Sequence, residues 1–412
     1  MENFKIWVGV DLGAAGHQVC VVDRERNILL ERKSKHEGAS TAQLIDELLG
    51  LVDGAAELIG VALETPQSAI AEAMLDRGLH VYSINPKQLD RLRDRYTVAG
   101  AKDDRRDAFV LAATLCTDGH HYREIRLGSA ELVQLRELSR LHDELGTEEN
   151  GLANRIDGEL LRYFPEMRKV GSVHTDEWML SLLKLAPTPA KARKLRASTI
   201  RSVLERVRRI TADEIMTIFR EPSLKVAPGV TEACAHHIAL LSRRLRLVRE
   251  QKAETHLQMR RLLEKLSEPV ESQDPKIVEH RDAAIIQSLP GVGTIVSATM
   301  LAEAWQPLQD RDYTRLRALC GSAPVTRRSG KTSVTVMRRA CSPRLRQALY
   351  HWARCGVQND ARTKAHYRRL RLAGHTHGRA LRGVADRLLA LLVKLLEGGQ
   401  LFDPSRWTPI SA

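Results

Sequence analysis

Several features that would point to a membrane or to the cell exterior are missing from this sequence. It has no uninterrupted apolar stretch of about 18 residues or more, which a membrane-spanning helix needs. No basic and then apolar leader precedes the first predicted strand. The six cysteines are scattered and contain no C-x-x-C pair, which argues against a zinc module and favours reduced thiols. We therefore expect a cytoplasmic protein with no membrane contact.

Acidic residues are also absent between Asp312 and Asp360, an interval with ten basic side chains. Ordinary surfaces mix both signs of charge, so this interval predicts contact with a polyanion. The net charge of +13 and the pI near 9.6 favour nucleic acid, because basic surfaces gain affinity by releasing counterions from phosphate backbones. The side chains predicted to bind nucleic acid are Arg105, Arg106, Arg327, Arg328, Lys331, Arg338, Arg339, Arg344 and Arg346.

With 412 residues, the chain is long enough for two or three domains, and a hydrophobic content of 43% is ordinary for a globular protein. The N-terminal part has the element order strand, strand, strand, helix, strand, helix, strand, helix. This order predicts an α/β domain with a mixed sheet of the RNase H type. The predicted elements are strands 5–11, 18–23, 27–32, 58–64 and 80–84, and helices 41–52, 68–75 and one from Pro86.

Acidic residues stand at conspicuous places in this pattern. Asp11 and Glu64 each end an apolar strand, although acids form strands poorly. Asp104 and Asp107 would lie one turn apart on one face if their segment opens a helix. Carboxylates of this kind suit Mg²⁺ or Mn²⁺. The alternatives are that the strand-end acids merely enter loops and that the aspartates sit at a solvated helix start, favoured by its dipole.

The middle of the chain is predicted to be helical. Leucines spaced by seven in 132–165 and a 4-3 pattern in 241–266, with Lys252 and Thr255 at seam positions, predict two arms of a helical hairpin or coiled coil. The arms either mediate self-association or pack within one chain. Between them, 171–230 contains four prolines among short amphipathic helices, and the polar stretch 267–282 is a predicted linker.

The C-terminal segment offers two glycine-rich features. The turn 288–294 separates two predicted helices, and its N–H groups could lie against a phosphate. Gly330-Lys-Thr resembles the end of a phosphate-binding loop, but the first glycine of that motif would fall at Val325, so we reject it. Ser329, on a predicted loop between arginines and a lysine, is a candidate nucleophile toward a phosphodiester. The alternative is an ordinary turn residue.

Together these stretches resemble the DEDD-type insertion-sequence transposases, the group described as bridge-RNA-guided recombinases. The resemblance covers nearly the whole chain in the family's order. The matching stretches are Val8-Gly-Val-Asp-Leu-Gly13, Ala62-Leu-Glu-Thr-Pro66, Asn85-Pro-Lys87, Ala101-Lys-Asp-Asp-Arg-Arg-Asp-Ala108, Leu289-Pro-Gly-Val-Gly293, Gly321-Ser-Ala-Pro324, Arg328-Ser-Gly-Lys331 and Pro343-Arg-Leu-Arg-Gln-Ala-Leu349.

The resemblance implies an α/β RuvC-like catalytic domain at 1–125, a helical and coiled-coil region at 126–270, and a mostly α-helical transposase domain at 283–400. It makes Asp11, Glu64, Asp104 and Asp107 a metal-binding tetrad for Mg²⁺ or Mn²⁺ and makes Ser329 the nucleophile. Asp104 rather than Asp103 is chosen by its spacing to Asp107, and Ser333 is a second candidate hydroxyl.

The implied function is a DNA transposase that cuts and rejoins the strands of an insertion sequence through a transient phosphoserine link, without ATP. Its implied partners are DNA and a bridge RNA that selects the target by base pairing. It implies a homo-oligomer, a dimer or tetramer, in the bacterial cytosol or nucleoid.

Two other function classes stay open on the sequence. Asp11-Leu-Gly13 after a strand is similar to the phosphate-binding turn of an actin-like kinase or ATPase, although no second Asp-Gly turn or adenosine segment follows. The other class is a non-catalytic nucleic-acid scaffold whose acids are structural. Mg²⁺-dependent nicking that is lost in Asp11→Ala would separate an enzyme from a scaffold.

Overall fold

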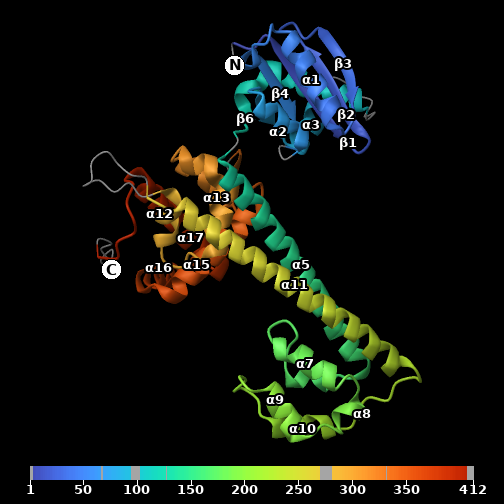
Figure 1. Cartoon of the computed structure of the whole chain (residues 1–412). Helices are drawn as coiled ribbons and strands as arrows, with labels where there is room; N and C mark the ends of the chain where they lie inside the picture. The colour runs from blue at the N-terminus through green and yellow to red at the C-terminus, as the bar shows by residue number, and fades with distance from the viewer. Residues whose placement is uncertain are drawn as a thin grey trace. The chain divides into compact units, whose positions relative to one another are not determined.

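The computed structural model describes residues 3–65, 68–93, 103–126, 128–269, 281–330 and 332–405. The chain divides into two compact units, Met1–Ser129 and Ala130–Ala412. Figure 1 shows the elements of both units. Of the predicted linker, residues 270–280 lie outside the described part of the chain.

The first unit is built on a mixed six-stranded sheet with the strand order β3-β2-β1-β4-β5-β6. β1, β2 and β3 form an antiparallel meander, β4 and β5 continue from β1 in parallel, and β6 closes the edge antiparallel to β5. The predicted mixed α/β sheet is therefore confirmed, with β6 as an addition to it. The strands are β1 (Ile6–Gly13), β2 (Gly16–Val22), β3 (Ile28–Ser34), β4 (Ile59–Leu63), β5 (His80–Ser83) and β6 (Arg123–Glu124).

Helices cover both faces of this sheet because its central strands are apolar on both sides. One core joins Ile6, Val8 and Val10 of β1 to helices α1 and α2. The other core joins Trp7 of β1 and Ala62 of β4 to helices α3 and α4. Alternate residues of each strand thus face opposite layers, as strand geometry requires. The helical elements are α1 (Gly38–Gly50), η1 (Ala56–Leu58), α2 (Ala69–Asp76), α3 (Pro86–Arg93), α4 (Asp104–Asp118) and η2 (Gly119–His121).

β1 is longer than predicted. The expected strand ends at Asp11 and enters a turn at Gly13, but β1 runs through Asp11 to Gly13, which pairs with Gly16 across a two-residue turn. Hydrogen bonding to β2 keeps Asp11 in the sheet, opposite Gln18. A paired strand holds its side chains in a fixed orientation, so Asp11 is held more firmly than a loop residue would be.

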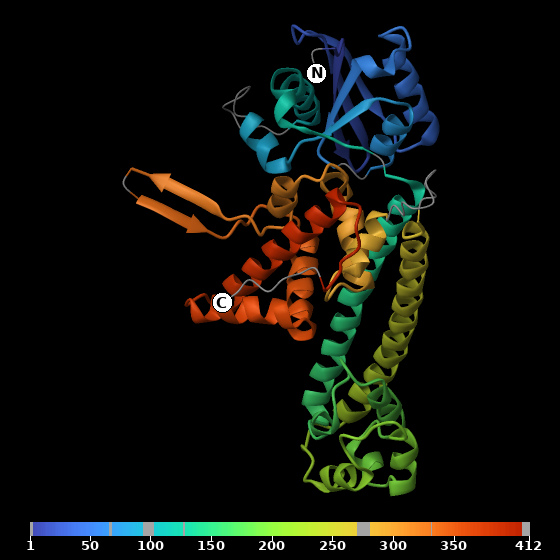
Figure 2. The same cartoon turned by 90° about the vertical axis from the view of Figure 1, so that its left-hand side faces the viewer.

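Two long helices dominate the second unit: α5 (Ala130–Tyr163, 34 residues) and α11 (Val230–Leu266, 37 residues). They lie side by side, as both cartoons show (Figures 1 and 2), and thus form the predicted helical hairpin by packing within one chain. At the predicted seam positions, Thr255 is buried and Lys252 forms an ion pair with Glu149 of α5, with Nζ and Oε2 2.7 Å apart.

Between the two arms, five short helices form their own hydrophobic core with the adjoining ends of α5 and α11. Thr211 and Glu214 make a capping box at the start of α10, which satisfies backbone N–H groups that a helix start leaves unpaired. This confirms the predicted short helices in 171–230. The helices within that interval are α7 (Glu177–Leu185), α8 (Pro189–Ala192), α9 (Ala197–Val203) and α10 (Ala212–Arg220), and α6 (Met167–Val170) precedes it.

The remaining chain is a helical cluster with one β-hairpin. Its core contains the fully buried Trp352 of α15 and a row of leucines from α17. The hairpin of β7 and β8 projects from these helices (Figure 2). The elements are α12 (Asp282–Ser288), α13 (Thr294–Gln309), α14 (Tyr313–Leu319), β7 (Val325–Ser329), β8 (Thr332–Val336), α15 (Pro343–Asn359), α16 (Ala361–Leu372) and α17 (His377–Glu397).

Candidate active site

The two strand-end acids of the first unit lie on neighbouring strands. β1 and β4 are parallel, and their register pairs Gly9 with Ala62 and Val10 with Leu63. Asp11 and Glu64 follow these pairs directly, at the same edge of the sheet. Since successive side chains alternate between faces, Asp11 shares the face of Gly9, and Glu64 shares the face of Ala62. This is the face that α4 covers.

The other two acids lie in the first turn of α4, which begins at Asp104. The carboxylate of Asp103 caps this helix by accepting a hydrogen bond from the Arg105 backbone N–H, with Oδ1 and N 3.2 Å apart. Asp103 therefore has a structural role that an N-cap aspartate commonly fills. Asp104 is exposed, whereas Asp107 is only 1% exposed. A buried carboxylate at the start of a helix is unusual enough to require a stabilising interaction.

Gly9 places the start of α4 close to the acid-bearing strands. A Cβ atom added to Gly9 would lie 1.9 Å from the backbone oxygen of Ala108 and 2.6 Å from the backbone N of Ala112. The helix backbone therefore rests directly on β1, two residues before Asp11. Asp107, next to Ala108 in the chain, is carried to the same part of that face. The sequence signal for this contact is a glycine within a buried apolar strand.

Replacing Gly9 with alanine should therefore destabilise the first unit. The added methyl group cannot fit without displacing α4, and such overpacking typically costs about 1–3 kcal/mol. Thermal unfolding of the full chain should show a lower Tm for Gly9→Ala. Gly151→Ala is the matched control, since a Cβ there meets nothing within 4 Å, and alanine in a helix should raise stability by about 0.5–1 kcal/mol. Equal effects of the two substitutions would contradict the close packing of α4 on β1.

Asp11 and Glu64 thus follow paired residues of neighbouring strands, and Asp104 and Asp107 lie in the first turn of the helix that covers the same face of the sheet. Their donor set consists of carboxylate oxygens alone, which fits Mg²⁺ or Mn²⁺ rather than zinc or copper. Within the residues described, no group of three or more His, Cys, Asp or Glu side chains is arranged as a ready metal site.

Ser329, the candidate nucleophile, lies at the tip of the β7–β8 hairpin. It is the last residue of β7, pairs with Thr332 and is exposed. The predicted loop is wrong at this point, because Ser329 belongs to a strand. The β-branched run Thr332-Ser-Val-Thr-Val336 favours a strand, and Gly330, with φ of +55°, permits the tight turn. Alternation puts Arg327 and Ser329 on one face of β7.

Comparisons with known proteins bear on both units. Residues 8–165 match a family model described as Transposase, and residues 283–368 match one described as Transposase IS116/IS110/IS902 family. The chain is 31% identical to the mini-circle putative transposase for IS117 of Streptomyces coelicolor, over 98% of this chain and 97% of that protein. This chain belongs to the IS110 family of DEDD transposases.

Two further relatives agree with this assignment. The putative transposase y4uE of Sinorhizobium fredii is 40% identical over 49% of this chain and 56% of its own length. The IS900 insertion element's uncharacterized 42 kDa protein of Mycobacterium paratuberculosis is 24% identical over 98% of both chains. The transposase is thus an enzyme of DNA transposition that binds DNA, and the kinase and scaffold alternatives are wrong. Transposases of the DEDD type typically use divalent metal ions.

Family membership does not show which arginines bind nucleic acid. The contacts of each arginine show whether its side chain is already engaged within the protein. Arg344 of α15 is engaged inside the second unit: Nε donates to Asp143 at 2.8 Å, Nη2 donates to Ser139 at 2.7 Å, and Nη1 pairs with Glu303. It ties α15 to α5 and α13. Its guanidinium is therefore a structural cross-link, and its predicted contact with nucleic acid stays untested.

Arg346 and Arg338 hold the base of the hairpin in a similar way. Arg346 Nη2 donates to the carbonyl oxygens of Arg338 and Arg339, each at 3.0 Å, and Arg338 Nε donates to that of Ala323 at 3.3 Å. By contrast, Arg327 and Arg328 are exposed on β7 and have no carboxylate partner among the described residues. Their predicted contact with nucleic acid stays untested, and Lys331 lies outside the described residues.

The glycine turn between α12 and α13 packs inward. Trp352 Nε1 donates to the carbonyl oxygen of Pro290 at 3.0 Å. Gly291 has φ of +79°, and a Cβ there would lie 2.5 Å from the backbone N of Gly356. The turn is therefore docked against α15, which gives Gly291 a packing role, whereas a Cβ on Gly293 would meet nothing within 4 Å.

Among the described helices of the transposase, none is long and apolar enough to span a membrane. Each of the six cysteines is free.

Proposed function

We propose that this transposase cuts and rejoins the DNA strands of its insertion sequence by phosphodiester transfer through a phosphoserine on Ser329. The observation that carries the proposal is the register of β1 and β4, which sets Asp11 beside Glu64 on the face where α4 begins. Four oxygen-donor side chains at one sheet edge suit a pair of divalent ions. In this scheme, 1–125 carries the acids, 126–270 the helical arms and 283–400 the serine.

The carboxylates of Asp11, Glu64, Asp104 and Asp107 would hold the ions. When bound, Mg²⁺ or Mn²⁺ supplies Lewis-acid stabilisation of the charge on the phosphate oxygens. The protein orients these ligands through the paired strand β1 and the first turn of α4. The buried position of Asp107 fixes one ligand, and the exposed position of Asp104 leaves another free to adjust.

Ser329 would perform the transfer. Its Oγ bonds to phosphorus as its proton passes to water, and the bond from phosphorus to the leaving strand breaks, with the electron pair staying on that strand's oxygen, which then takes up a proton. A hydroxyl at another strand end attacks the phosphoserine, and Ser329 regains its proton. One P–O bond forms for each that breaks, so no ATP is needed. Arg327, on the same face of β7, would stabilise charge on the phosphate.

A bridge RNA would select the target by base pairing, and the enzyme would act as a dimer or tetramer. The exposed positive charge on β7 and the overall charge of +13 support binding of more than one nucleic-acid strand. We expect purified full-length transposase to exchange DNA strands in Mg²⁺ only when RNA transcribed from the element's flanking region is added. Equal exchange without that RNA, on element DNA prepared free of transcripts, would contradict the RNA part of the proposal.

A further inference from the structure

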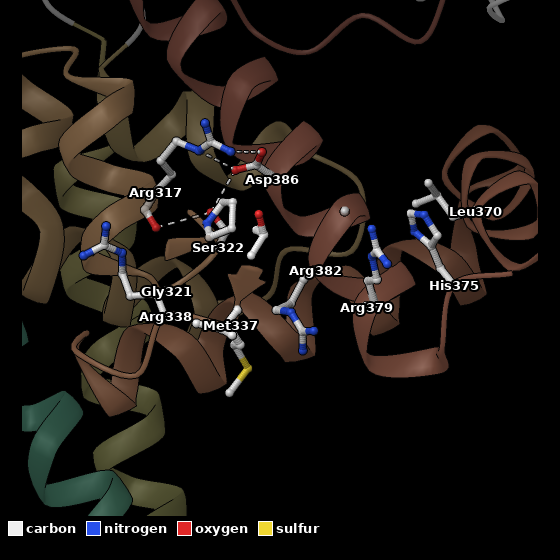
Figure 3. Close-up of a pocket in the computed structure, with 14 residues that line it drawn as sticks. Arg317, Gly321, Ser322, Met337, Arg338, Leu370, His375, Arg379, Arg382 and Asp386 are labelled. Carbon is white, nitrogen blue, oxygen red and sulfur yellow. Dashed lines mark hydrogen bonds and ion pairs between the residues drawn. The ribbon is translucent and has the colours of Figure 1, made fainter. Parts of the chain in front are cut away.

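A cavity of about 350 Å³ lies at the base of the β7–β8 hairpin. The end of β8 forms one side of it, and the α16–α17 junction forms the other (Figure 3). Apolar side chains of Met337 and Leu370 and the cationic side chains of Arg379 and Arg382 line it. Its volume falls within the range typical of ligand pockets.

The cavity is strongly positive. Its lining contains four arginines and a single aspartate, a formal excess of three positive charges. That aspartate, Asp386, is already engaged by Arg317, whose Nε and Nη2 donate to it at 3.0 and 2.7 Å, and by the Ser322 hydroxyl, which donates at 2.8 Å. The dashed lines in Figure 3 mark these contacts. In the described chain, no carboxylate pairs with Arg379 or Arg382.

The packing of α16 on α17 shapes this cavity. Gly383 of α17 faces Leu370 of α16, and a Cβ on Gly383 would lie 2.9 Å from Leu370 Cδ1. The close approach of the two helices keeps Arg379 and Arg382, one turn apart on α17, beside the hairpin base. Two unpaired guanidinium groups one turn apart match a phosphate, which arginine binds by paired N–H donors.

We propose that this cavity binds a backbone phosphate of the DNA strand that Ser329 cuts. The proposal rests on the function proposed above for Ser329. Thr335 lines the cavity, and Thr332, three residues before it, pairs with Ser329 at the hairpin tip. Three residues of strand span about 10 Å. The bound phosphate therefore lies within a few nucleotides of the one that is cut.

The test uses full-length protein with Ser329→Ala, so that DNA is bound without being cut. One DNA phosphate at a time is replaced by a neutral methylphosphonate, and affinity is measured with Arg379→Ala/Arg382→Ala and with its parent. A methylphosphonate at one position within a few nucleotides of the cut site should weaken the parent several-fold and leave the double variant unchanged. The double variant should also reduce the salt dependence of log Kd by about 1–2.

Two control variants distinguish the loss of a specific phosphate contact from a general loss of positive charge or of folding. Arg261→Ala/Lys394→Ala removes two exposed positive charges elsewhere in the second unit and should retain the methylphosphonate effect. Arg379→Lys/Arg382→Lys keeps the charge and should retain most of the salt dependence. Equal methylphosphonate sensitivity of parent and Arg379→Ala/Arg382→Ala would overturn the proposal, as would an effect seen only with methylphosphonates in RNA. Binding is measured without cleavage, so the two proposals can fail separately. If the methylphosphonate effect is found but Ser329 proves not to be the nucleophile, phosphate binding by the cavity stands and only the proposed function is overturned.

Discussion

Substituting Ser329 with alanine should abolish covalent protein–DNA adducts while leaving DNA binding near the wild-type level. The hydroxyl is the proposed leaving and attacking group, and within the described part of the hairpin Ser329 is exposed and held by backbone pairing with Thr332. The adducts are measured on a denaturing gel after incubation with element DNA and Mg²⁺. Affinity for the same DNA is measured in parallel by fluorescence anisotropy.

Ser333→Ala is the matched control for this experiment. Ser333 pairs with Arg328 across the hairpin and therefore faces away from Ser329, which shares its face with Thr332. Its substitution makes the same chemical change four residues away and should leave adduct formation intact. If adducts persist in Ser329→Ala and vanish in Ser333→Ala, the nucleophile is Ser333 and the assignment of Ser329 that the family resemblance implied is wrong.

Substituting Asp11 with asparagine should lower DNA cleavage by roughly a thousand-fold or more at saturating Mg²⁺. Losing a metal ligand forfeits several kcal/mol of charge stabilisation in the transition state, and each 1.4 kcal/mol is a factor of ten. The change keeps the size of the side chain and its place in β1, opposite Gln18, so the fold should persist. Single-turnover cleavage rates and the Tm of the same preparations check both parts.

A second pair of variants tests which aspartate near the start of α4 is a ligand. Asp103→Asn should leave cleavage near wild type, because asparagine also caps helices well and can still accept the Arg105 N–H. Asp104→Asn should lower cleavage by at least about ten-fold. The reverse order of effects would exchange the roles of Asp103 and Asp104.

Much of the first unit follows from patterns that its sequence displays. Apolar runs such as Leu58 to Glu64 and the spacing of apolar residues in 41–52 specify strand and helix by periods of 2 and 3.6, and the mixed sheet follows from the element order. Asp11 and Glu64 stand out in the sequence because acids rarely follow apolar runs without a reason, although β1 does not end at Asp11. The extension of β1 to Gly13 is not readable, since it depends on hydrogen bonds to β2.

The candidate site is harder to predict from the sequence than the fold, because several of the contacts that shape it join residues far apart in the chain. Gly9 matters because of Ala108, almost a hundred residues away. The one-sided charge between Asp312 and Asp360 looks unbalanced in sequence, yet Asp143, Glu303 and Asp386 from outside that interval pair with its arginines. The β7–β8 hairpin had a local signal in its β-branched residues, but the helical pattern on both sides masked it.

The central claim is that four carboxylates distant in sequence act together on divalent ions. Its most direct test is an electron paramagnetic resonance titration of Mn²⁺ into the full-length transposase with its DNA substrate bound. We predict that wild type binds Mn²⁺ and that Asp11→Asn and Glu64→Gln each weaken this binding by about ten-fold or more, whereas Asp103→Asn does not. Unchanged Mn²⁺ binding in both Asp11→Asn and Glu64→Gln would contradict the account.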